Sequence, residues 1–265
     1  MNREDIVESA IRFTQESPLN YIRREDALSP GCSGMRLFDP PIFAFGPAND
    51  DLYTEFLSPG IIGGHFLPPA KWLPGARTVI SFFLPYTERI RLANAENYQW
   101  PAVEWLHGRY EGQVFVAELS EHINRILADS NHASVAPSLD PGFMMGNESG
   151  RNTSNWSERH IAYACGLGTF SLSKGLITDK GTCGRFGSVV TDLCLPTDQR
   201  LYSEAEEYCT KCGVCAANCP SNAISEEGKN DALCAEFLKK TIEKHTPRYG
   251  CGKCQVGVPC ESGRP

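Results

Sequence analysis

The sequence predicts a mixed fold of the α/β (α+β) class, followed by a small cysteine-rich domain. Two segments repeat apolar residues at helical spacing, and two others are short apolar runs typical of buried strands. Most large apolar residues lie in the first 195 positions, whereas eight of the 12 cysteines lie after position 200. We therefore expect a hydrophobic domain over residues 1–198 and a second domain over 199–265 that depends on metal more than on a core.

The first elements follow from periodicity. Residues 3–16 are predicted to form a helix behind Asn2, a good N-cap, because apolar residues recur there at helical spacing. Residues 28–75 are rich in Gly and Pro and predict long loops, which in compact domains are usually functional. The run Thr78–Leu84, closed by Pro85, predicts a buried strand. A second amphipathic helix is predicted over about 113–129 from Val116, Leu119, Ile123 and Ile126.

The later elements are shorter. Residues 130–155 are loop-like, and a helix is predicted over about 157–165, with Ser157 as its cap and Gly166 as its stop. The apolar run 189–195 predicts a second buried strand, and a linker begins at Pro196. No internal repeat interrupts this order.

The most informative motif lies in the second domain. Cys209, Cys212, Cys215 and Cys219-Pro220 have the spacing C-x2-C-x2-C-x3-C-P, which is the ferredoxin-type signature of [4Fe–4S] clusters. A zinc ribbon would instead use two separated C-x2-C pairs. A disulfide framework would need an oxidising compartment. We therefore predict iron–sulfur clusters rather than either alternative.

A second set of cysteines makes two clusters the expectation. It consists of Cys234, Cys251, Cys254 and Cys260. In two-cluster ferredoxins the fourth cysteine of the motif ligates the other cluster. The predicted metal ligands are therefore crossed: Cys209, Cys212 and Cys215 with Cys260, and Cys251, Cys254 and Cys234 with Cys219.

Charge and hydropathy exclude some function classes. The formal net charge is −7, with no Lys/Arg block, which disfavours a nucleic-acid partner. The first residues are charged and lack the apolar stretch of a signal peptide, and no run of 18 apolar residues exists. Clusters together with unpaired thiols favour a cytoplasmic protein that needs no membrane.

Three segments carry a family resemblance. The stretch Glu158-Arg-His-Ile-Ala-Tyr-Ala-Cys-Gly-Leu-Gly-Thr-Phe170, placed before the cluster motif, resembles the epoxyqueuosine reductase and reductive dehalogenase superfamily. Thr78–Tyr86 is similar to that family's early core strand, and Trp105-Leu-His-Gly-Arg-Tyr-Glu111 to its Ala-Arg-Gly-Arg-Asp-Tyr-His segment. The resemblance implies a short divergent member with a nitroreductase-like, corrinoid-binding module joined to a two-cluster ferredoxin-like module.

The resemblance also implies cofactor contacts. Gly166, Leu167, Gly168 and Thr169 would approach a corrinoid (cobalamin), since glycines let the backbone come close to a ligand. Arg109 and Tyr110 would line the same cavity. The alternatives without a cofactor role are that Gly166 only ends a helix and that Arg109 is only a surface cation. FMN in place of the corrinoid, or no second cofactor, are the competing possibilities.

One departure concerns proton transfer. Epoxyqueuosine reductases carry an Asp as proton donor six residues before the position of Glu158, and here that position is Asn152. An amide cannot act as a general acid, so Asn152 is expected to orient substrate or cofactor. His160 or His65 could donate the proton instead. Cys183, in a Gly-rich loop, is a candidate for a redox or cobalt-facing role, whereas Cys165 and Cys194 are predicted to be small core residues.

The function predicted from the sequence is electron transfer to a substrate. Electrons from a ferredoxin or flavodoxin would pass through the clusters to a corrinoid, which would reduce an organic substrate other than tRNA. The alternative is an electron-transfer protein that reactivates another corrinoid protein without turning over a substrate itself.

Overall fold

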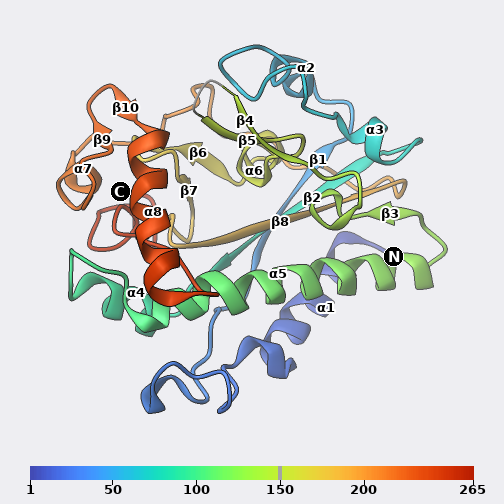
Figure 1. Ribbon diagram of the computed structural model, residues 1–265. Helices are drawn as coiled ribbons and strands as arrows, with labels where there is room; N and C mark the ends of the chain where they lie inside the picture. Colours follow the sequence, from blue (N-terminus) through green and yellow to red (C-terminus); the bar gives the residue numbers. More distant parts are fainter. Residues whose placement is uncertain (149–150) are drawn as a thin grey trace.

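A four-stranded antiparallel sheet forms the centre of the molecule (Figure 1). The computed structural model describes residues 1–148 and 151–265, except for the side chains of residues 147–148 and 151–152. The strand order is β1 (Ile42–Pro47), β2 (Thr78–Pro85), β8 (Gly184–Thr191) and β3 (Ser134–Val135). Mixed helices and antiparallel strands confirm the predicted fold class.

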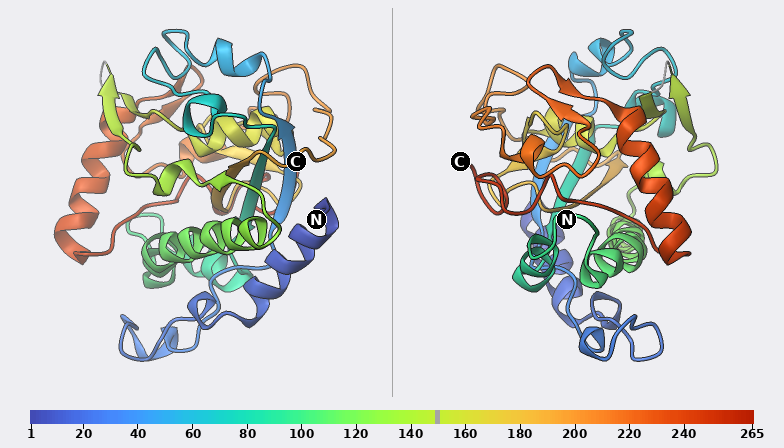
Figure 2. Two further views of the ribbon diagram at one scale, coloured as in Figure 1. Left: turned by 90° about the vertical axis from the view of Figure 1, so that its right-hand side faces the viewer. Right: turned by 60° about the vertical axis from the view of Figure 1, so that its left-hand side comes forward.

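Helices cover both faces of this sheet. Figure 2 shows α1 (Arg3–Glu16) and α5 (Val103–Asp129) on one side and α6 (Glu158–Cys165) on the other. Every residue of β2 is buried, and its side chains alternate between two hydrophobic clusters. Ile80 and Phe82 face α1 and α5, whereas Val79 and Phe83 face α6.

Short elements complete the first domain. They are the 3-10 turns η1 (Pro18–Asn20), η2 (Pro30–Cys32) and η3 (Pro137–Leu139), the helices α2 (Leu52–Glu55), α3 (Pro69–Trp72) and α4 (Glu88–Ala95), and the hairpins β4–β5 (Met145–Glu148, Arg151–Ser154) and β6–β7 (Gly168–Phe170, Leu176–Thr178). The segments expected to be loops at 28–75 and 130–155 therefore contain several of these elements.

The cysteine-rich segment is built from small elements. It contains α7 (Val214–Ala217), the hairpin β9–β10 (Ile224–Ser225, Gly228–Lys229) and the longer α8 (Asp231–His245). Its segment nearest the C-terminus packs into the first domain, because Val256 belongs to the hydrophobic cluster under α1 and α5. None of the described helices is long and apolar enough to cross a membrane.

Two predicted elements have different bounds in the structure. The helix predicted over 113–129 begins at Val103, because its first two turns are buried on several sides and show no one-sided pattern. The strand predicted over 189–195 spans Gly184–Thr191. Gly187 is part of this strand. A Cβ at this position would lie 2.4 Å from the Phe82 ring, so only glycine fits there. The helix at 3–16 is confirmed, with a capping box between Asn2 and Asp5.

Candidate functional site

Four cysteines from two distant segments line one pocket. Three are Cys209, Cys212 and Cys215 around the start of α7, and the fourth is Cys260. Lys211 and Gly213 adopt left-handed backbone conformations, with φ of 52° and 76°, which curl the loop around the pocket. Cys212 is exposed and Cys215 is buried, so the pocket meets solvent on the side of Cys212.

The other four cysteines of this domain form a second group, made of Cys219, Cys234, Cys251 and Cys254. Burial, and then Cys254 and Cys234, raise the pKa of Cys251 to about 12. Burial together with Cys234 and Cys219 also raises the pKa of Cys254. Cys219 and Cys254 pack against the same small apolar cluster. The capped first turn of α8 carries Cys234.

Each group can offer four thiolates to a metal centre. Burial raises the pKa of Cys215 to about 11 and that of Cys260 to about 12, so binding a metal would have to displace their protons. Within the described ranges, no three His, Cys, Asp or Glu side chains converge closely enough to hold a single ion.

The loop that carries Cys260 is anchored to the first domain. The Thr182 N–H donates to the Cys260 carbonyl (2.9 Å), and the Cys183 N–H donates to the Glu261 carbonyl (3.2 Å). The Glu261 carboxylate also pairs with Arg91 on α4 (2.6 Å). The pocket of the first group is thus fixed to the end of the central sheet.

A buried lysine anchors the second group. Lys253 lies between Cys251 and Cys254 and is fully buried. Its Nζ donates to the Asn94 carbonyl (2.6 Å) and to Asn94 Oδ1 (3.0 Å), and Asn94 Nδ2 donates to the Cys251 carbonyl (3.0 Å). Burial lowers the pKa of Lys253 to about 8. Helix α4 therefore holds this cysteine loop in place.

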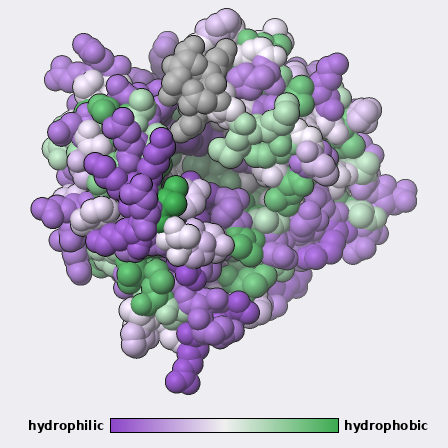
Figure 3. Space-filling view, viewed as in Figure 1, coloured by the Kyte–Doolittle hydropathy of each residue, from purple (hydrophilic) through white to green (hydrophobic). Residues whose placement is uncertain are grey.

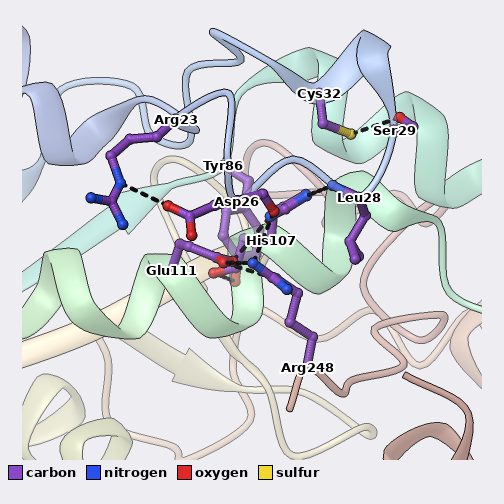
Figure 4. Close-up of polar contacts among 10 residues, drawn as sticks. Arg23, Asp26, Leu28, Ser29, Cys32, Tyr86, His107, Glu111 and Arg248 are labelled. Atoms are coloured by element: carbon purple, nitrogen blue, oxygen red, sulfur yellow. Dashed lines mark hydrogen bonds and ion pairs between the residues drawn. The ribbon is translucent and has the colours of Figure 1, made fainter. Parts of the chain in front are cut away.

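A polar network ties the segment after α8 to α5 (Figure 4). Arg248 Nε donates to Glu111 Oε1 (2.8 Å), and its guanidinium also donates to the Asp26 carbonyl (2.9 Å). His107 Nε2 accepts from the Leu28 N–H (3.1 Å), so Nδ1 carries the proton and donates to Glu111 (3.1 Å). Burial opposes ionisation of Glu111, but the bonds from His107 and Arg248 outweigh it and lower its pKa.

A hollow opens in the face shown in Figure 3, beneath the β4–β5 hairpin and over α6 and β6. Arg159 on α6 is exposed, and its guanidinium donates to the Lys174 carbonyl (2.7 Å).

The Gly-Leu-Gly-Thr loop predicted to contact a corrinoid is packed inside the protein. Gly166 ends α6 with φ of 102°, as its alternative role of helix stop requires. A Cβ at Gly168 would lie 1.9 Å from the Ile177 carbonyl oxygen in β7. Leu167 is 6% exposed and Thr169 is fully buried. Leu167, Gly168 and Thr169 therefore offer little surface to a ligand, whereas Gly166 is partly exposed, and the corrinoid contact of this loop stays a prediction.

The other predicted cofactor contacts lie on α5. Arg109 Nη2 donates to the Tyr249 hydroxyl (3.2 Å), and its guanidinium lies 4.7 Å from that ring centre. Tyr110 is exposed, with the Arg248 guanidinium 5.6 Å from its ring. Both residues therefore border the segment that follows α8.

His160 does not supply the expected acid. His160 Nδ1 is 2.8 Å from the Ser157 hydroxyl, and its ring packs against Phe56 and Phe170. Burial, and then the charge of Arg159, lower its pKa to about 4. The ring is neutral near pH 7, so His160 is not a cationic proton donor there, contrary to the prediction.

The other two polar candidates lie at the β4–β5 hairpin. His65 Nε2 is 2.7 Å from the Thr153 hydroxyl of β5. The side chain of Asn152 lies outside the described residues, and only its backbone position, opposite residue 147, is described.

The thiols outside the two groups are mostly core residues. Cys183 is 1% exposed and packs in the cluster under α5, and burial raises its pKa well above the usual value. It is a protonated packing thiol, not the predicted cavity-facing one. Cys165 is buried, as predicted, whereas Cys194 is exposed because the strand ends at Thr191, before it.

Sequence reasoning missed Glu158. The Ser188 hydroxyl donates to Glu158 Oε2 (2.7 Å), and Oε1 is buried without a partner among the described residues. Burial raises the pKa of Glu158 to about 7. At the first position of a helix it looks like an ordinary first-turn acid, and only the packing against β8 distinguishes it.

Comparisons with known proteins agree with the cysteine geometry. Residues 205–225 match the 4Fe-4S binding domain. The epoxyqueuosine reductase of Vibrio cholerae is 34% identical over 207 residues, which cover 72% of this chain and 52% of that protein. A tetrachloroethene reductive dehalogenase of Desulfitobacterium hafniense is 32% identical over 110 residues, covering 38% of this chain and 20% of that protein.

The chain belongs to the epoxyqueuosine reductase/reductive dehalogenase-like superfamily. Solved structures agree in fold. An epoxyqueuosine reductase with an epoxyqueuosine-modified tRNA-Tyr stem loop superposes with a TM-score of 0.57 at 16% identity, covering 99% of this chain and 67% of that chain. A catabolic reductive dehalogenase superposes with a TM-score of 0.54 at 15% identity, covering 98% of this chain and 36% of that chain. The chain spans about half the length of the Vibrio cholerae member and less of the dehalogenase.

Proposed function

We propose that this superfamily member is an iron–sulfur oxidoreductase that passes low-potential electrons through two [4Fe–4S] clusters to a cofactor in the recess. The observation that carries the proposal is the serial arrangement of the two cysteine groups. The first group has the exposed Cys212 at its edge, and the second has Cys234 and Cys254 beside Arg159.

This order gives the electrons a direction. A ferredoxin or flavodoxin can approach only a cluster near the surface, and Cys212 is the exposed member of its group. The four cysteines of the second group are only partly exposed, so a cluster there would be farther from the solvent. Cys254 of this group belongs with Val258 and Leu172 to the small apolar cluster that also contains Cys215 and Cys260, so the groups are in contact.

We propose a corrinoid as the acceptor, with FMN as the alternative. Arg185 Nε is buried with no partner in the described residues, and such a donor suits the polar rim and phosphodiester of a corrinoid. Arg109 and Tyr110 would contact it. When bound, a corrinoid supplies a cobalt centre that accepts electrons one at a time and reduces organic substrates. Arg159 would stabilise negative charge beside it.

The proposed substrate is an organic molecule other than tRNA. A solved epoxyqueuosine reductase of Bacillus subtilis is described with a catalytic Asp loop. Asn152 replaces the acid that the family resemblance predicts there, and His160 is neutral near pH 7. The same departure favours the second candidate function, reductive activation of another corrinoid protein without substrate turnover.

Three measurements on anaerobically reconstituted protein test the proposal. Iron analysis should give about eight atoms per chain, whereas about four, or stoichiometric zinc, contradicts two clusters. Optical titration with cobalamin should shift its spectrum, and tight FMN binding without that shift replaces the corrinoid by a flavin. Epoxyqueuosine-modified tRNA should not be turned over. Turnover of that tRNA would contradict the proposed substrate class.

A further inference from the structure

A buried cation lies inside the loop of the second cysteine group. Among the described residues, Lys253 is the only lysine, arginine, aspartate or glutamate that is buried, with 0% of its surface exposed. It stands between Cys251 and Cys254, so its backbone belongs to the same C-x2-C turn as two of the predicted ligands. Burying a charge costs much free energy unless an opposite charge and hydrogen bonds compensate it.

Hydrogen bonds fix the Lys253 side chain beside the Cys251 backbone. Its Nζ donates to the carbonyl (2.6 Å) and to Oδ1 (3.0 Å) of Asn94. In turn, Asn94 Nδ2 donates to the Cys251 carbonyl (3.0 Å). Both partners of Nζ are oxygens, as an ammonium group with three donors and no acceptor requires. One amide group thus separates the ammonium from a predicted ligand residue of the second group.

No carboxylate compensates Lys253 in the described part of the chain, because the two oxygens that accept from Nζ are neutral. Asn94 lies in the last turn of α4. The carbonyl end of a helix carries roughly half a negative charge, which offsets the ammonium only in part. The rest of the positive charge is left for another group to balance.

The cations near the first cysteine group have carboxylate partners. Lys211 lines the pocket of that group and lies 3.4 Å from Glu206. Arg91 binds Glu261, the residue after Cys260, at 2.6 Å. The two groups therefore lie in different electrostatic surroundings, and the uncompensated buried charge of Lys253 belongs to the loop of the second.

We propose that Lys253 is a fixed positive charge that raises the reduction potential of the [4Fe–4S] cluster in the second group above that of the cluster in the first. A cubane held by four thiolates is negatively charged, and reduction adds one more negative charge. A buried cation stabilises the reduced form more than the oxidised form, since charges interact more strongly away from water. An electron that enters near Cys212 would then pass spontaneously to the second cluster.

This inference rests on the proposed function in one respect, which is that both clusters are present; it needs no corrinoid and no substrate. The alternative is a purely structural role, in which Lys253 only joins the cysteine loop to α4. The two roles predict different measurements. A structural anchor affects whether the cluster is retained, whereas a fixed charge affects the midpoint potential of a cluster that is retained.

The test uses the full chain after anaerobic cluster reconstitution. A redox titration followed by electron paramagnetic resonance gives the midpoint potential of each cluster, and a titration of Cys215→Ala, which keeps only the second cluster, assigns the signals. Lys253→Met removes the charge, and Asn94→Asp keeps the lysine but places a carboxylate beside it. Each should lower the potential of the second cluster by about 59 mV, a tenfold change in the equilibrium constant of a one-electron couple.

The first cluster should shift much less in both variants. The matched control is Lys211→Met, which removes an exposed cation that is already paired with Glu206, and it should leave both potentials nearly unchanged.

Iron analysis separates the outcomes. About four iron atoms per wild-type chain would contradict the two clusters of the proposed function, and this inference with them. About eight iron atoms with an unchanged second potential in both variants would overturn the role of Lys253 and leave the proposed function intact. If Lys253→Met loses the second cluster, the potential of Asn94→Asp decides. Loss of that cluster from both variants would mean that Lys253 is only an anchor, which also overturns the proposal.

Discussion

Glu111 on α5 and Arg248, three residues before Cys251, form a part-buried ion pair with two hydrogen bonds, from Nε (2.8 Å) and from Nη2. This pair joins the helix that supports the central sheet to the loop of the second cysteine group. The position of that group therefore depends on a side chain of the first domain.

The first prediction concerns this pair. Glu111→Gln should lower the free energy of unfolding by about 1–3 kcal/mol, because it leaves the part-buried Arg248 without its counter-charge. Urea denaturation of the iron-loaded protein measures it. Asp39→Asn, which breaks the exposed pair with Arg36, is the matched control and should change little. Equal effects of the two substitutions would contradict a special role for Glu111.

The second prediction is a pH dependence from Glu158. Its folded-state pKa of about 7 lies above the usual value of 4.5 for a glutamate. The native state therefore holds the proton more tightly, and stability falls as pH rises from 4.5 to 7, by roughly 3 kcal/mol at most. Glu158→Gln removes this proton and should not show that loss. The difference in unfolding free energy between variant and wild type should thus grow across this window; a constant difference would refute it.

The third prediction separates the two cysteine groups. Cys215→Ala should remove about four iron atoms and leave the other cluster mostly intact, and Cys254→Ala should do the same for the other group. Cys194→Ala is the control, because Cys194 is exposed and belongs to neither group. Iron analysis and electron paramagnetic resonance of the reduced proteins read out the result. Loss of all iron from Cys215→Ala would mean that the two sites are not separable.

The fourth prediction tests the internal role of the Gly-Leu-Gly loop. Gly168→Ala should destabilise the protein by about 3 kcal/mol or more, since its Cβ would overlap backbone that cannot move away. Gly64→Ala, where nothing lies within 4 Å of an added Cβ, should be nearly neutral. A stable Gly168→Ala protein that has lost only cobalamin binding would restore the cofactor-contact interpretation.

The parts of the structure that could be predicted are those with local signals. Asn2 and the apolar spacing behind it fix α1, and the continuous run from Thr78 fixes β2, because each pattern reflects one element's own burial. The cysteine spacing likewise predicts that Cys209, Cys212 and Cys215 line one pocket, since a cluster dictates the geometry of its loop.

The parts that could not be predicted depend on tertiary neighbours. Lys253 reaches Asn94 only because α4 packs against the loop of the second cysteine group, and nothing around either residue in the sequence predicts the other. The resemblance placed the cofactor against Gly168, whereas the β6–β7 hairpin already fills that space. The lowered pKa of His160 is equally a product of its surroundings rather than of its type.

The pocket that begins with Cys209 is completed by Cys260, 51 residues later in the chain. During synthesis, the first three cysteines leave the ribosome well before the fourth. A metal centre at this pocket cannot be finished until Cys260 has emerged, by which time the sheet that anchors Cys260 can already have formed. Cluster insertion at this site can therefore follow the folding of the first domain.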